Sequence, residues 1–335
     1  MRSMTETRID VLLHPDSVLD VRTATDLARR ALDARGVAGD VAVTDDVSTA
    51  TGDAVVVPAP GGAVDLGGDD RCVVRVDFGL AEPDRAPNLF AHIRGRGLDG
   101  LRYAVDRVFH HRLHPAEVVR YGEHWEQRVE LRRCGRAGAP AAALVHGGYW
   151  REAFELDSLD AIAIDLLAHG FDTWNIEYRR PAAHGWSTTT ADVEAAMGVV
   201  DADTVVALGH SAGGQLALRW AADHRPAAVV SLAGVLDLAV ARTRLLGNSA
   251  AEVIDEADGA ASPRARLPLG VPTVVACATE DDPNLNDIGR EYVDAARDAG
   301  DEVDHVEGPG GHFAVVDPSS EVWADVVRSV QDRLR

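Results

Sequence analysis

A serine set among glycines is the residue of this sequence whose surroundings best suit a nucleophile. Residues Gly209–Gly213 read GHSAG, which matches G-x-S-x-G, between the apolar run TVVAL and the helical pattern GGQLALRWAADH. A serine on a tight strand-to-helix turn presents its hydroxyl at the end of the strand, and small neighbours allow the turn. Ser211 is therefore the candidate nucleophile, although the pattern alone also fits a glycine-rich turn with an idle serine.

A serine hydroxyl attacks well only when a base removes its proton and a carboxylate orients that base. His312 lies in the glycine-rich loop GPGGHF, after a strand-like run near the end of the chain, and we expect it to be the base. The acid should lie between the two in sequence, because sheets with such a serine turn use the chain order serine, acid, histidine.

Acidic residues for this role follow the apolar run PTVVACAT. Asp281 fits best by its distance from the end of that strand, and Asp282 is its main rival, while Glu280 and Asp287 lie nearby. We predict a triad of Ser211, Asp281 and His312, with the choice between the two adjacent aspartates left open.

Acyl transfer also needs amide donors for the negative oxygen that forms on the substrate. The segment LVHGGYW offers Gly147 and Gly148 after an early strand, and the residue after the nucleophile offers the amide of Ala212. These residues are the predicted oxyanion hole. Tyr149 and Trp150 come next and are predicted to line the substrate pocket, with packing as the alternative role.

The elements that would hold these residues alternate regularly from about residue 117. Strand candidates are AAALVHG, DTWNIEY, TVVALGH, AAVVSLAG, PTVVACAT and Glu302–Glu307, with helical patterns between them such as Ser158–His169 and Thr190–Val200. Apolar strands that alternate with helices predict a mostly parallel sheet with helices on both faces. The fold class is therefore α/β, and residues 116–335 have the size of one complete domain.

Residues 1–115 show a second, smaller α/β pattern. RIDVLL, DVAVTDD, AVVVPAP and CVVRVDF read as strands, Asp16–Arg35 reads as a helix closed by Gly36, and residues 98–112 read as a helix. His114-Pro115 breaks that helix and begins a linker. We predict a separate small N-terminal domain, for which the sequence indicates no role.

The composition excludes several kinds of partner. The chain of 335 residues carries a formal charge of −21, and all of its basic residues are arginine, so nucleic acid and anionic membranes are not expected partners. No run has the apolar length of a membrane span or a signal peptide, which predicts a cytoplasmic protein. Cys72, Cys134 and Cys277 lie far apart without C-x-x-C spacing, so neither a disulfide nor a zinc site is predicted from them.

Other motifs are read more simply. Gly95–Gly100 matches G-x-G-x-x-G, but the preceding NLFAHIR is not a clean buried strand and no βαβ unit follows, so we read a turn that enters a helix and predict no cofactor. His110 and His114 share a helical face without an acidic third ligand, so no metal site is predicted. The acidic run Asp65–Asp70 reads as a solvated loop.

Two further groups follow the strand DTWNIEY. Arg179 and Arg180 could bind a substrate carboxylate, or they could form structural salt bridges. His184 and Trp186 lie in the next loop, at the expected carboxyl edge of the sheet. Either could contact substrate, and neither is placed in the catalytic set.

Four motifs together carry a resemblance to a known group of enzymes. HGGYW at His146–Trp150, YRR at Tyr178–Arg180, GHSAGG at Gly209–Gly214 and GHF at Gly311–Phe313 resemble the α/β-hydrolase superfamily. More narrowly, they are similar to the esterase and lipase group that includes the kynurenine formamidases (arylformamidases). The resemblance covers about residues 118–335 and implies a cofactor-free serine hydrolase with Ser211 as its nucleophile, on an α/β-hydrolase fold.

The same resemblance implies Asp281 and His312 as the other triad members. The chain departs from the group where relatives commonly carry His-Gly before the acid loop, because Cys277-Ala278 stands there and TEDDPNLND replaces the usual valine-proline ending. The N-terminal unit is a second departure, since a small formamidase does not need one.

The expected activity is hydrolysis of small carboxylic esters or of aryl amides and formamides through an acyl-enzyme. Substrates should be small because Leu236–Leu267, where a lid could lie, is modest in length. An acyltransferase that excludes water, and a binding protein that keeps the fold without turnover, are the alternatives. The expected partner is the small-molecule substrate, and the sequence is compatible with a homo-oligomer.

Overall fold

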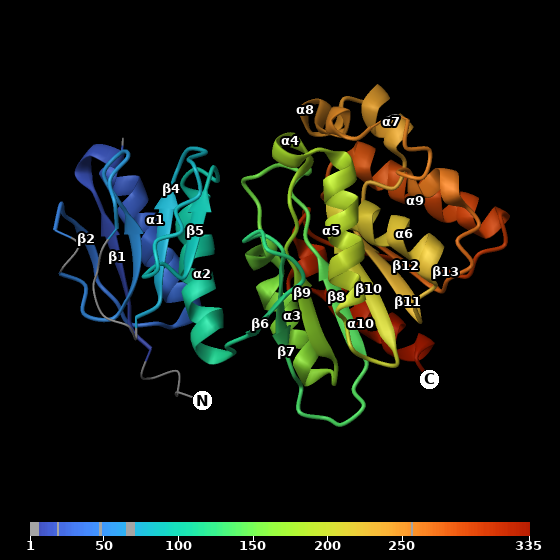
Figure 1. Cartoon of the computed structure of the whole chain (residues 1–335), viewed down its shortest axis with the longest axis horizontal. Coiled ribbons are helices and arrows are strands. Elements are labelled where there is room, and N and C mark those ends of the chain that lie inside the picture. Colours follow the sequence, from blue (N-terminus) through green and yellow to red (C-terminus); the bar gives the residue numbers. More distant parts are fainter. Residues whose placement is uncertain (1–6, 19, 47–48, 65–70, 256) are drawn as a thin grey trace. The chain divides into compact units, whose positions relative to one another are not determined.

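The computed structural model describes residues 7–18, 20–46, 49–64, 71–255 and 257–335. The run predicted as a solvated loop, Asp65–Asp70, lies outside the described residues. The chain divides into two compact units, Met1–Pro115 and Ala116–Arg335. Each unit has its own sheet and its own core, and each is described by itself (Figure 1).

The first unit is a five-stranded sheet in the order β2-β1-β3-β4-β5, with every pair parallel. Its strands are β1 (Ile9–Leu13), β2 (Val41–Val43), β3 (Asp53–Val57), β4 (Val73–Asp77) and β5 (Ala91–Arg94), and its helices are α1 (Val21–Arg35) and α2 (Asp99–Leu113). The two helices pack on each other, and the main core lies between them and the sheet. A smaller apolar cluster covers the other face.

Two elements of this unit differ from the sequence expectations. Helix α1 begins at Val21 because Pro15–Ser17 form a 3-10 turn and the Asp20 carboxylate accepts a hydrogen bond from the Thr23 amide at 3.1 Å. Strand β5 was not expected as a clean strand. It forms because its polar side chains are satisfied: His92 Nε2 lies 2.6 Å from Asp77 Oδ2.

The second unit holds an eight-stranded sheet in the order β13-β12-β11-β10-β8-β9-β7-β6. The strands are β6 (Glu117–Arg120), β7 (Arg128–Arg132), β8 (Ala141–Val145), β9 (Asp172–Ile176), β10 (Val205–His210), β11 (Ala228–Leu232), β12 (Thr273–Ala278) and β13 (Val303–Gly308). Six strands are parallel, and β7 and β6 add an antiparallel edge that the sequence pattern did not indicate.

Helices lie on both faces of this sheet (Figure 1). They are α3 (Asp160–Ala168), α4 (Pro181–His184), α5 (Trp186–Gly198), α6 (Ala212–His224), α7 (Leu238–Thr243), α8 (Leu246–Ser249), α9 (Pro283–Asp298) and α10 (Glu321–Arg333). Helices α3 and α10 are tied by the Trp323 indole N–H, which donates to Asp165 at 2.7 Å. The expected α/β fold with a mostly parallel, doubly covered sheet is confirmed.

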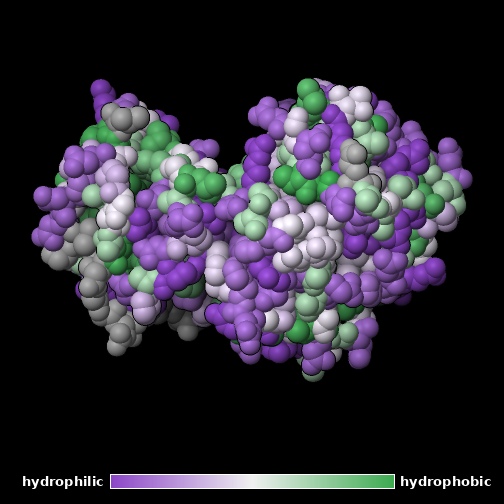
Figure 2. Space-filling model, turned by 45° about the horizontal axis from the view of Figure 1, so that its top comes forward, coloured by the Kyte–Doolittle hydropathy of each residue, from purple (hydrophilic) through white to green (hydrophobic). Residues whose placement is uncertain are grey.

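The core of the second unit is built from strands that are buried on both faces. In β8, β11 and β12 every residue is buried. Leu208 of β10 pairs in register with Leu144 on one side and Val230 on the other. Such continuous burial is typical of a central parallel sheet, and it makes the strand ends rigid supports for whatever follows them. The surface in Figure 2 is mostly hydrophilic, with apolar residues in small groups.

Candidate active site

Ser211 stands on a sharp turn between β10 and α6. Its backbone has φ 54° and ψ −118°, a left-handed conformation that a residue with a side chain adopts only under strain. Hydrogen bonds fix the turn, because the Ser211 amide donates to Leu232 at 2.8 Å and the Gly214 amide donates to Ser211 at 2.9 Å. The turn therefore holds the Ser211 side chain at the carboxyl end of the central strand, next to the N-terminus of α6.

The glycines of this turn are required by close contacts. A Cβ on Gly209 would lie 2.1 Å from the Gly213 carbonyl oxygen, and one on Gly213 would lie 2.0 Å from the Val145 oxygen. No side chain fits at those distances. The predicted need for small residues beside Ser211 thus has its physical reason in the backbone of β8 and α6.

The segment after β8 approaches Ser211 closely. A Cβ on Gly147 would meet the His210 carbonyl oxygen at 2.6 Å and the Ser211 Cβ at 2.8 Å. Gly148 has φ 108°, and a Cβ there would overlap Phe154. Gly147 therefore lies directly against the serine turn, and Ala212 begins α6 on the other side of Ser211. Both backbone segments predicted to hold an oxyanion meet at this serine.

Asp281 and His312 lie together at the ends of β12 and β13. Asp281 Oδ2 is 2.7 Å from His312 Nδ1, and the Asp281 side chain is only 6% exposed. Its other oxygen accepts a hydrogen bond from the Asp282 amide at 2.7 Å. The rival, Asp282, instead caps α9, since its carboxylate accepts from the Asn284 amide at 2.9 Å.

His210 contacts the loop that carries His312 and supports it. His210 Nε2 lies 3.2 Å from the His312 carbonyl oxygen, and the two imidazole rings are 4.7 Å apart. Burial, together with the neighbouring His312, keeps the pKa of His210 well below its usual range, so this ring is neutral and donates from Nε2.

The two predicted pocket residues are placed differently. Tyr149 is half-buried, with its ring against Gly247 of α8. Burial and the charges of Asp282 and Asp281 raise the pKa of its phenol, which places Tyr149 beside the acid loop. Trp150 is 1% exposed, and its indole N–H donates to Gln215 at 3.1 Å, so it packs in the core under the same segment.

Comparisons with known proteins agree with this geometry. Residues 142–268 match the family described as the alpha/beta hydrolase family. The residues after β8, β10, β12 and β13 gather at the carboxyl edge of the sheet, where open α/β sheets bind their ligands. Residues 116–335 therefore have the α/β-hydrolase fold, of which residues 142–268 match the family model.

Solved structures with the same fold include several esterases. A bacterial heroin esterase is 21% identical with a TM-score of 0.53, over 62% of this chain and 80% of its own. Esterase B from Lactobacillus Rhamnosis is 17% identical with a TM-score of 0.55, over 65% of this chain and 85% of its own. Esterase 2 from Thermogutta terrifontis, phosphonylated by sarin, is 19% identical with a TM-score of 0.54, over 65% and 94%. A comparison with curated protein sequences gives no match.

The hydrolase domain also holds a buried ionic network that sequence reasoning missed. His146 is fully buried; its Nδ1 lies 2.9 Å from the Gly147 oxygen and its Nε2 lies 3.1 Å from Glu177 Oε1. Arg180 Nη1 donates to the same Glu177 oxygen. Burial alone would raise the pKa of Glu177, but Arg180 and His146 hold it well below its usual range. The network therefore braces the segment that carries Gly147.

The arginines of YRR both have structural partners. Arg179 makes a bidentate pair with Asp192, at 2.8 Å and 2.7 Å. Arg180 is 1% exposed between Glu177 and Glu126. Of the two roles considered from the sequence, the structure supports salt bridges for both. A glutamate placed directly after the apolar strand DTWNI was the one available sign of the network.

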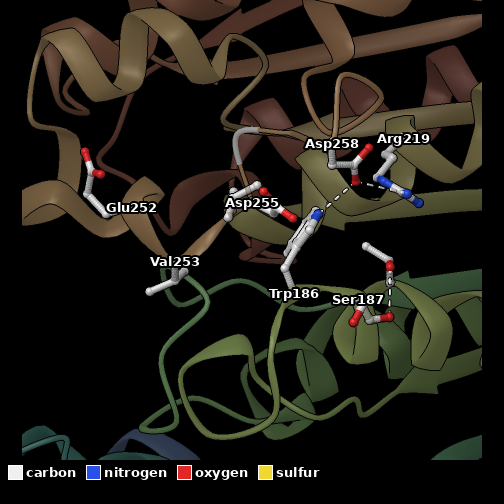
Figure 3. A pocket seen from close by; sticks show the side chains of 9 residues that line it. Trp186, Ser187, Arg219, Glu252, Val253, Asp255 and Asp258 are labelled. Carbon is white, nitrogen blue, oxygen red and sulfur yellow. Dashed lines mark hydrogen bonds and ion pairs between the residues drawn. The ribbon is translucent and has the colours of Figure 1, made fainter.

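A polar pocket of about 490 Å³ opens at the start of α5 (Figure 3). Trp186 donates from its indole N–H to Asp258 at 2.8 Å, and Arg219 donates to the same carboxylate at 3.2 Å. The lining also includes Glu252 and Asp255, and none of the predicted triad residues lines it. Trp186 thus forms part of the wall of this pocket.

The remaining sequence features have plain structural settings. Gly95 and Gly97 have positive φ and lead from β5 into α2, but β5 is the outermost strand of its sheet, and no further strand of that sheet follows α2. Dinucleotides bind instead where the strand order reverses, away from such an edge.

Cys72, Cys134 and Cys277 are free thiols. Among the described residues, no helix combines the length and apolar character that crossing a bilayer requires.

Proposed function

We propose that this protein is a serine hydrolase that cleaves small carboxylic esters through an acyl-enzyme. The observation that carries the proposal is the 2.7 Å contact between Asp281 Oδ2 and His312 Nδ1, at the same sheet edge as the strained turn of Ser211. The folds of three esterases support it. Aryl amides and formamides are the second substrate class in the proposal, because the same chemistry serves both.

The proposed roles start from the contact between Asp281 and His312. Asp281 accepts from His312 Nδ1–H, which leaves Nε2 of His312 with the lone pair that removes the Ser211 proton. The Ser211 oxygen then bonds to the substrate carbonyl carbon, and the carbonyl oxygen becomes negative. The amides of Ala212 and of Gly148 or Gly147 are the proposed donors to that oxygen.

The reaction is completed by the same groups. His312 gives its proton to the leaving alcohol or amine, and the carbonyl re-forms as an acyl-Ser211 ester. Water, deprotonated by His312, then attacks this ester, and the departing Ser211 oxygen takes the proton back. The products are an acid and an alcohol or amine, without a cofactor.

The proposal also covers the pocket and the location. Tyr149, between the acid loop and α8, is the proposed wall against which the acyl or leaving group packs. Helices α7 and α8 are short, which supports small substrates. Free cysteines and the acidic, lysine-free composition favour a cytoplasmic enzyme.

The proposal is tested with a panel of p-nitrophenyl esters, aryl formamides and lactones, on the full chain and on Ser211→Ala. We expect at least one class to be hydrolysed by the wild type, with a loss of about 10⁴-fold or more in the variant. Equal rates for the two proteins would contradict it. If transfer of the acyl group to an added alcohol is faster than hydrolysis, the protein is instead an acyltransferase.

A further inference from the structure

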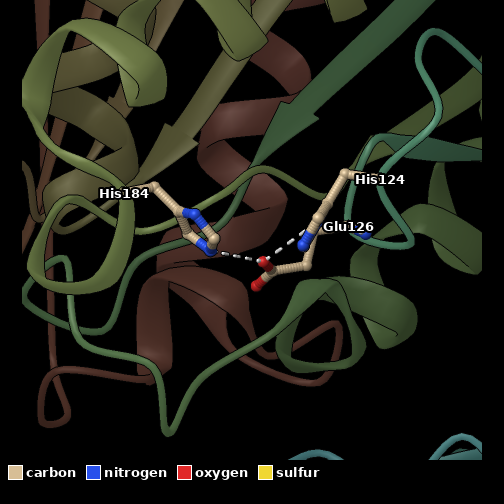
Figure 4. Close-up of side chains that lie close together, drawn as sticks. All are labelled: His124, Glu126 and His184. Atoms are coloured by element: carbon tan, nitrogen blue, oxygen red, sulfur yellow. Dashed lines mark hydrogen bonds and ion pairs between the residues drawn. The ribbon is translucent and has the colours of Figure 1, made fainter.

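Three side chains of the kinds that bind metal ions lie close together near the start of β7 in the second unit. They are His124 and Glu126, in the loop between β6 and β7, and His184, the last residue of α4. One candidate ligand atom from each lies within 4.8 Å of the other two. Figure 4 shows both imidazoles pointing toward the Glu126 carboxylate from different segments of the chain.

The distances in this cluster suit a bound ion better than hydrogen bonds. His124 Nδ1 and His184 Nε2 each lie 3.5 Å from Glu126 Oε2. A nitrogen–oxygen separation of this size is beyond a good hydrogen bond. It is close to the edge of a tetrahedron whose ligands sit about 2.0–2.1 Å from a zinc ion, which is about 3.4 Å.

The carboxylate is already oriented for one ligand bond. Arg180, which is almost fully buried, donates to Glu126 Oε1 and thereby leaves Oε2 turned to the two histidines. Glu126 itself is 3% exposed. A partner that fixes the second oxygen of a ligating carboxylate is a usual outer support of protein metal sites.

Nδ1 of His124 is unprotonated in this structure, because it accepts a hydrogen bond from the Glu126 amide at 3.3 Å. A metal ion bound at this nitrogen would replace that hydrogen bond, since the ring nitrogen has a single lone pair. The side chain of Gln127 holds the same loop by accepting a hydrogen bond from the His124 amide at 3.1 Å. The loop that supplies two of the three groups is thus preorganised by its own backbone contacts.

The surroundings allow an ion to enter and to keep a solvent ligand. The side chains of His124 and His184 are 32% and 30% exposed, so water can complete a fourth position. The acidic groups around the cluster are Glu126, Glu155 and Glu177, against Arg128 and Arg180. The charges of Glu155 and Glu177 offset those of Arg128 and Arg180, and burial raises the pKa of Glu126 to about 7, so the cluster has no fixed excess of negative charge.

We propose that His124, Glu126 and His184 bind one Zn²⁺ ion, with water as the fourth ligand. Two imidazoles and one carboxylate are a donor set that zinc accepts readily. The bound ion would join the loop at Tyr121–Gln127 to α4, which are distant in sequence. It would also meet the ionic network that runs through Arg180 and Glu177 to His146.

The test is titration of the metal-free full chain with Zn²⁺ by calorimetry, on the wild type, His124→Ala and His184→Ala. We expect one ion per wild-type chain and more than about tenfold weaker binding in each variant. Removal of His224, an exposed histidine 2.8 Å from Glu194, is the matched control and should leave binding unchanged. Circular dichroism checks that each variant is folded.

A second measurement keeps the proposal open to failure if a variant unfolds. Co²⁺ in place of Zn²⁺ should give the strong visible absorption of a four-coordinate site in the wild type, and Zn²⁺ should displace it. The proposal is overturned if the wild type binds no Zn²⁺ saturably, or if the variant lacking both His124 and His184 binds as the wild type does. Hydrolysis of esters by Ser211 is measured separately. Absence of zinc binding would therefore not contradict the hydrolase proposal, and absence of hydrolysis would not contradict the zinc proposal.

Discussion

Nδ1 of His312 lies 2.7 Å from Oδ2 of Asp281, whereas the adjacent Asp282 caps α9. Two neighbouring aspartates thus have different tasks. We predict that Asp281→Asn lowers kcat by about 10³–10⁴-fold, because an amide stabilises the wrong imidazole tautomer and cannot offset the charge on His312. Steady-state kinetics on an ester substrate measure this.

Asp282→Asn is the matched control for that experiment. Asparagine is also a good helix cap, so activity should change less than about tenfold and stability by less than about 1 kcal/mol. If Asp282→Asn were the more damaging of the two substitutions, the assignment of the acid would be wrong.

The close approach of Gly147 to the serine turn makes a second prediction. Gly147→Ala places a methyl group 2.6 Å from the His210 oxygen and 2.8 Å from the Ser211 Cβ. The segment must then move, and kcat should fall by about 10²-fold or more, since oxyanion donors tolerate little displacement. A Cβ on Gly198 meets nothing within 4 Å, so Gly198→Ala should leave kcat unchanged. Equal kinetics for the two variants would show that Gly147 does not support the oxyanion.

The buried position of Arg180 makes a third prediction, which concerns stability. Burial opposes its charge, yet Glu177 and Glu126 keep the pKa of Arg180 above its usual range. Arg180→Ala would leave both carboxylates buried without their cation, and the free energy of unfolding should fall by about 3–5 kcal/mol. Urea unfolding followed by tryptophan fluorescence measures the second unit, which contains all six tryptophans.

Arg328 serves as the comparison for Arg180. It pairs with Asp325 at 2.7 Å on the surface, with 68% of its side chain exposed. Its removal should change stability by less than about 1 kcal/mol. A loss in Arg180→Ala no larger than the loss in Arg328→Ala would mean that the buried network contributes nothing to the fold.

The first unit should lose stability in acid because of Asp77. Burial would raise the pKa of this carboxyl, but hydrogen bonds from His92 and Arg75 lower it to about 2. A depressed carboxyl pKa stabilises the folded state above the unfolded value near 4 and loses that effect as the pH falls toward 2. The contribution is below about 2 kcal/mol, because solvent screens part of the interaction.

Asp77→Asn isolates that contribution. The variant should be less stable than the wild type at pH 5 to 7, and the difference should shrink between pH 4 and 2. Circular dichroism detects unfolding of the first unit. A change in circular dichroism without a change in tryptophan fluorescence is assigned to the first unit, because all six tryptophans lie in the second. A difference that is constant with pH would contradict the ionic role of Asp77.

The sequence predicts the elements of the site well because parallel strands impose an order. Apolar runs mark β8, β10 and β12, and residues that follow parallel strands must gather at one edge. The positions of Ser211, Asp281 and His312 at that edge are therefore predictable from the sequence. The boundary between the two units can also be predicted, because Pro115 follows the end of helix α2 and prevents its continuation.

Features that depend on contacts between residues far apart in the chain cannot be predicted from the sequence. Strands β6 and β7 have mixed charged and apolar residues, so their pairing at the sheet edge leaves no clear periodic signal. Glu126 and Arg180 are 54 residues apart, and nothing local shows that burial joins them. The cluster of His124 and His184 is hidden for the same reason, since β9 and α4 must first place the second histidine.

The central claim is that Ser211 is an activated nucleophile, and covalent labelling tests it most directly. The folded full chain is incubated with a fluorophosphonate, and the modified residue is located by peptide mass spectrometry. We predict one adduct, on Ser211, that forms much more slowly in His312→Gln and is absent in Ser211→Ala. No adduct on Ser211, or labelling of Ser211 at the same rate without His312, would contradict the account.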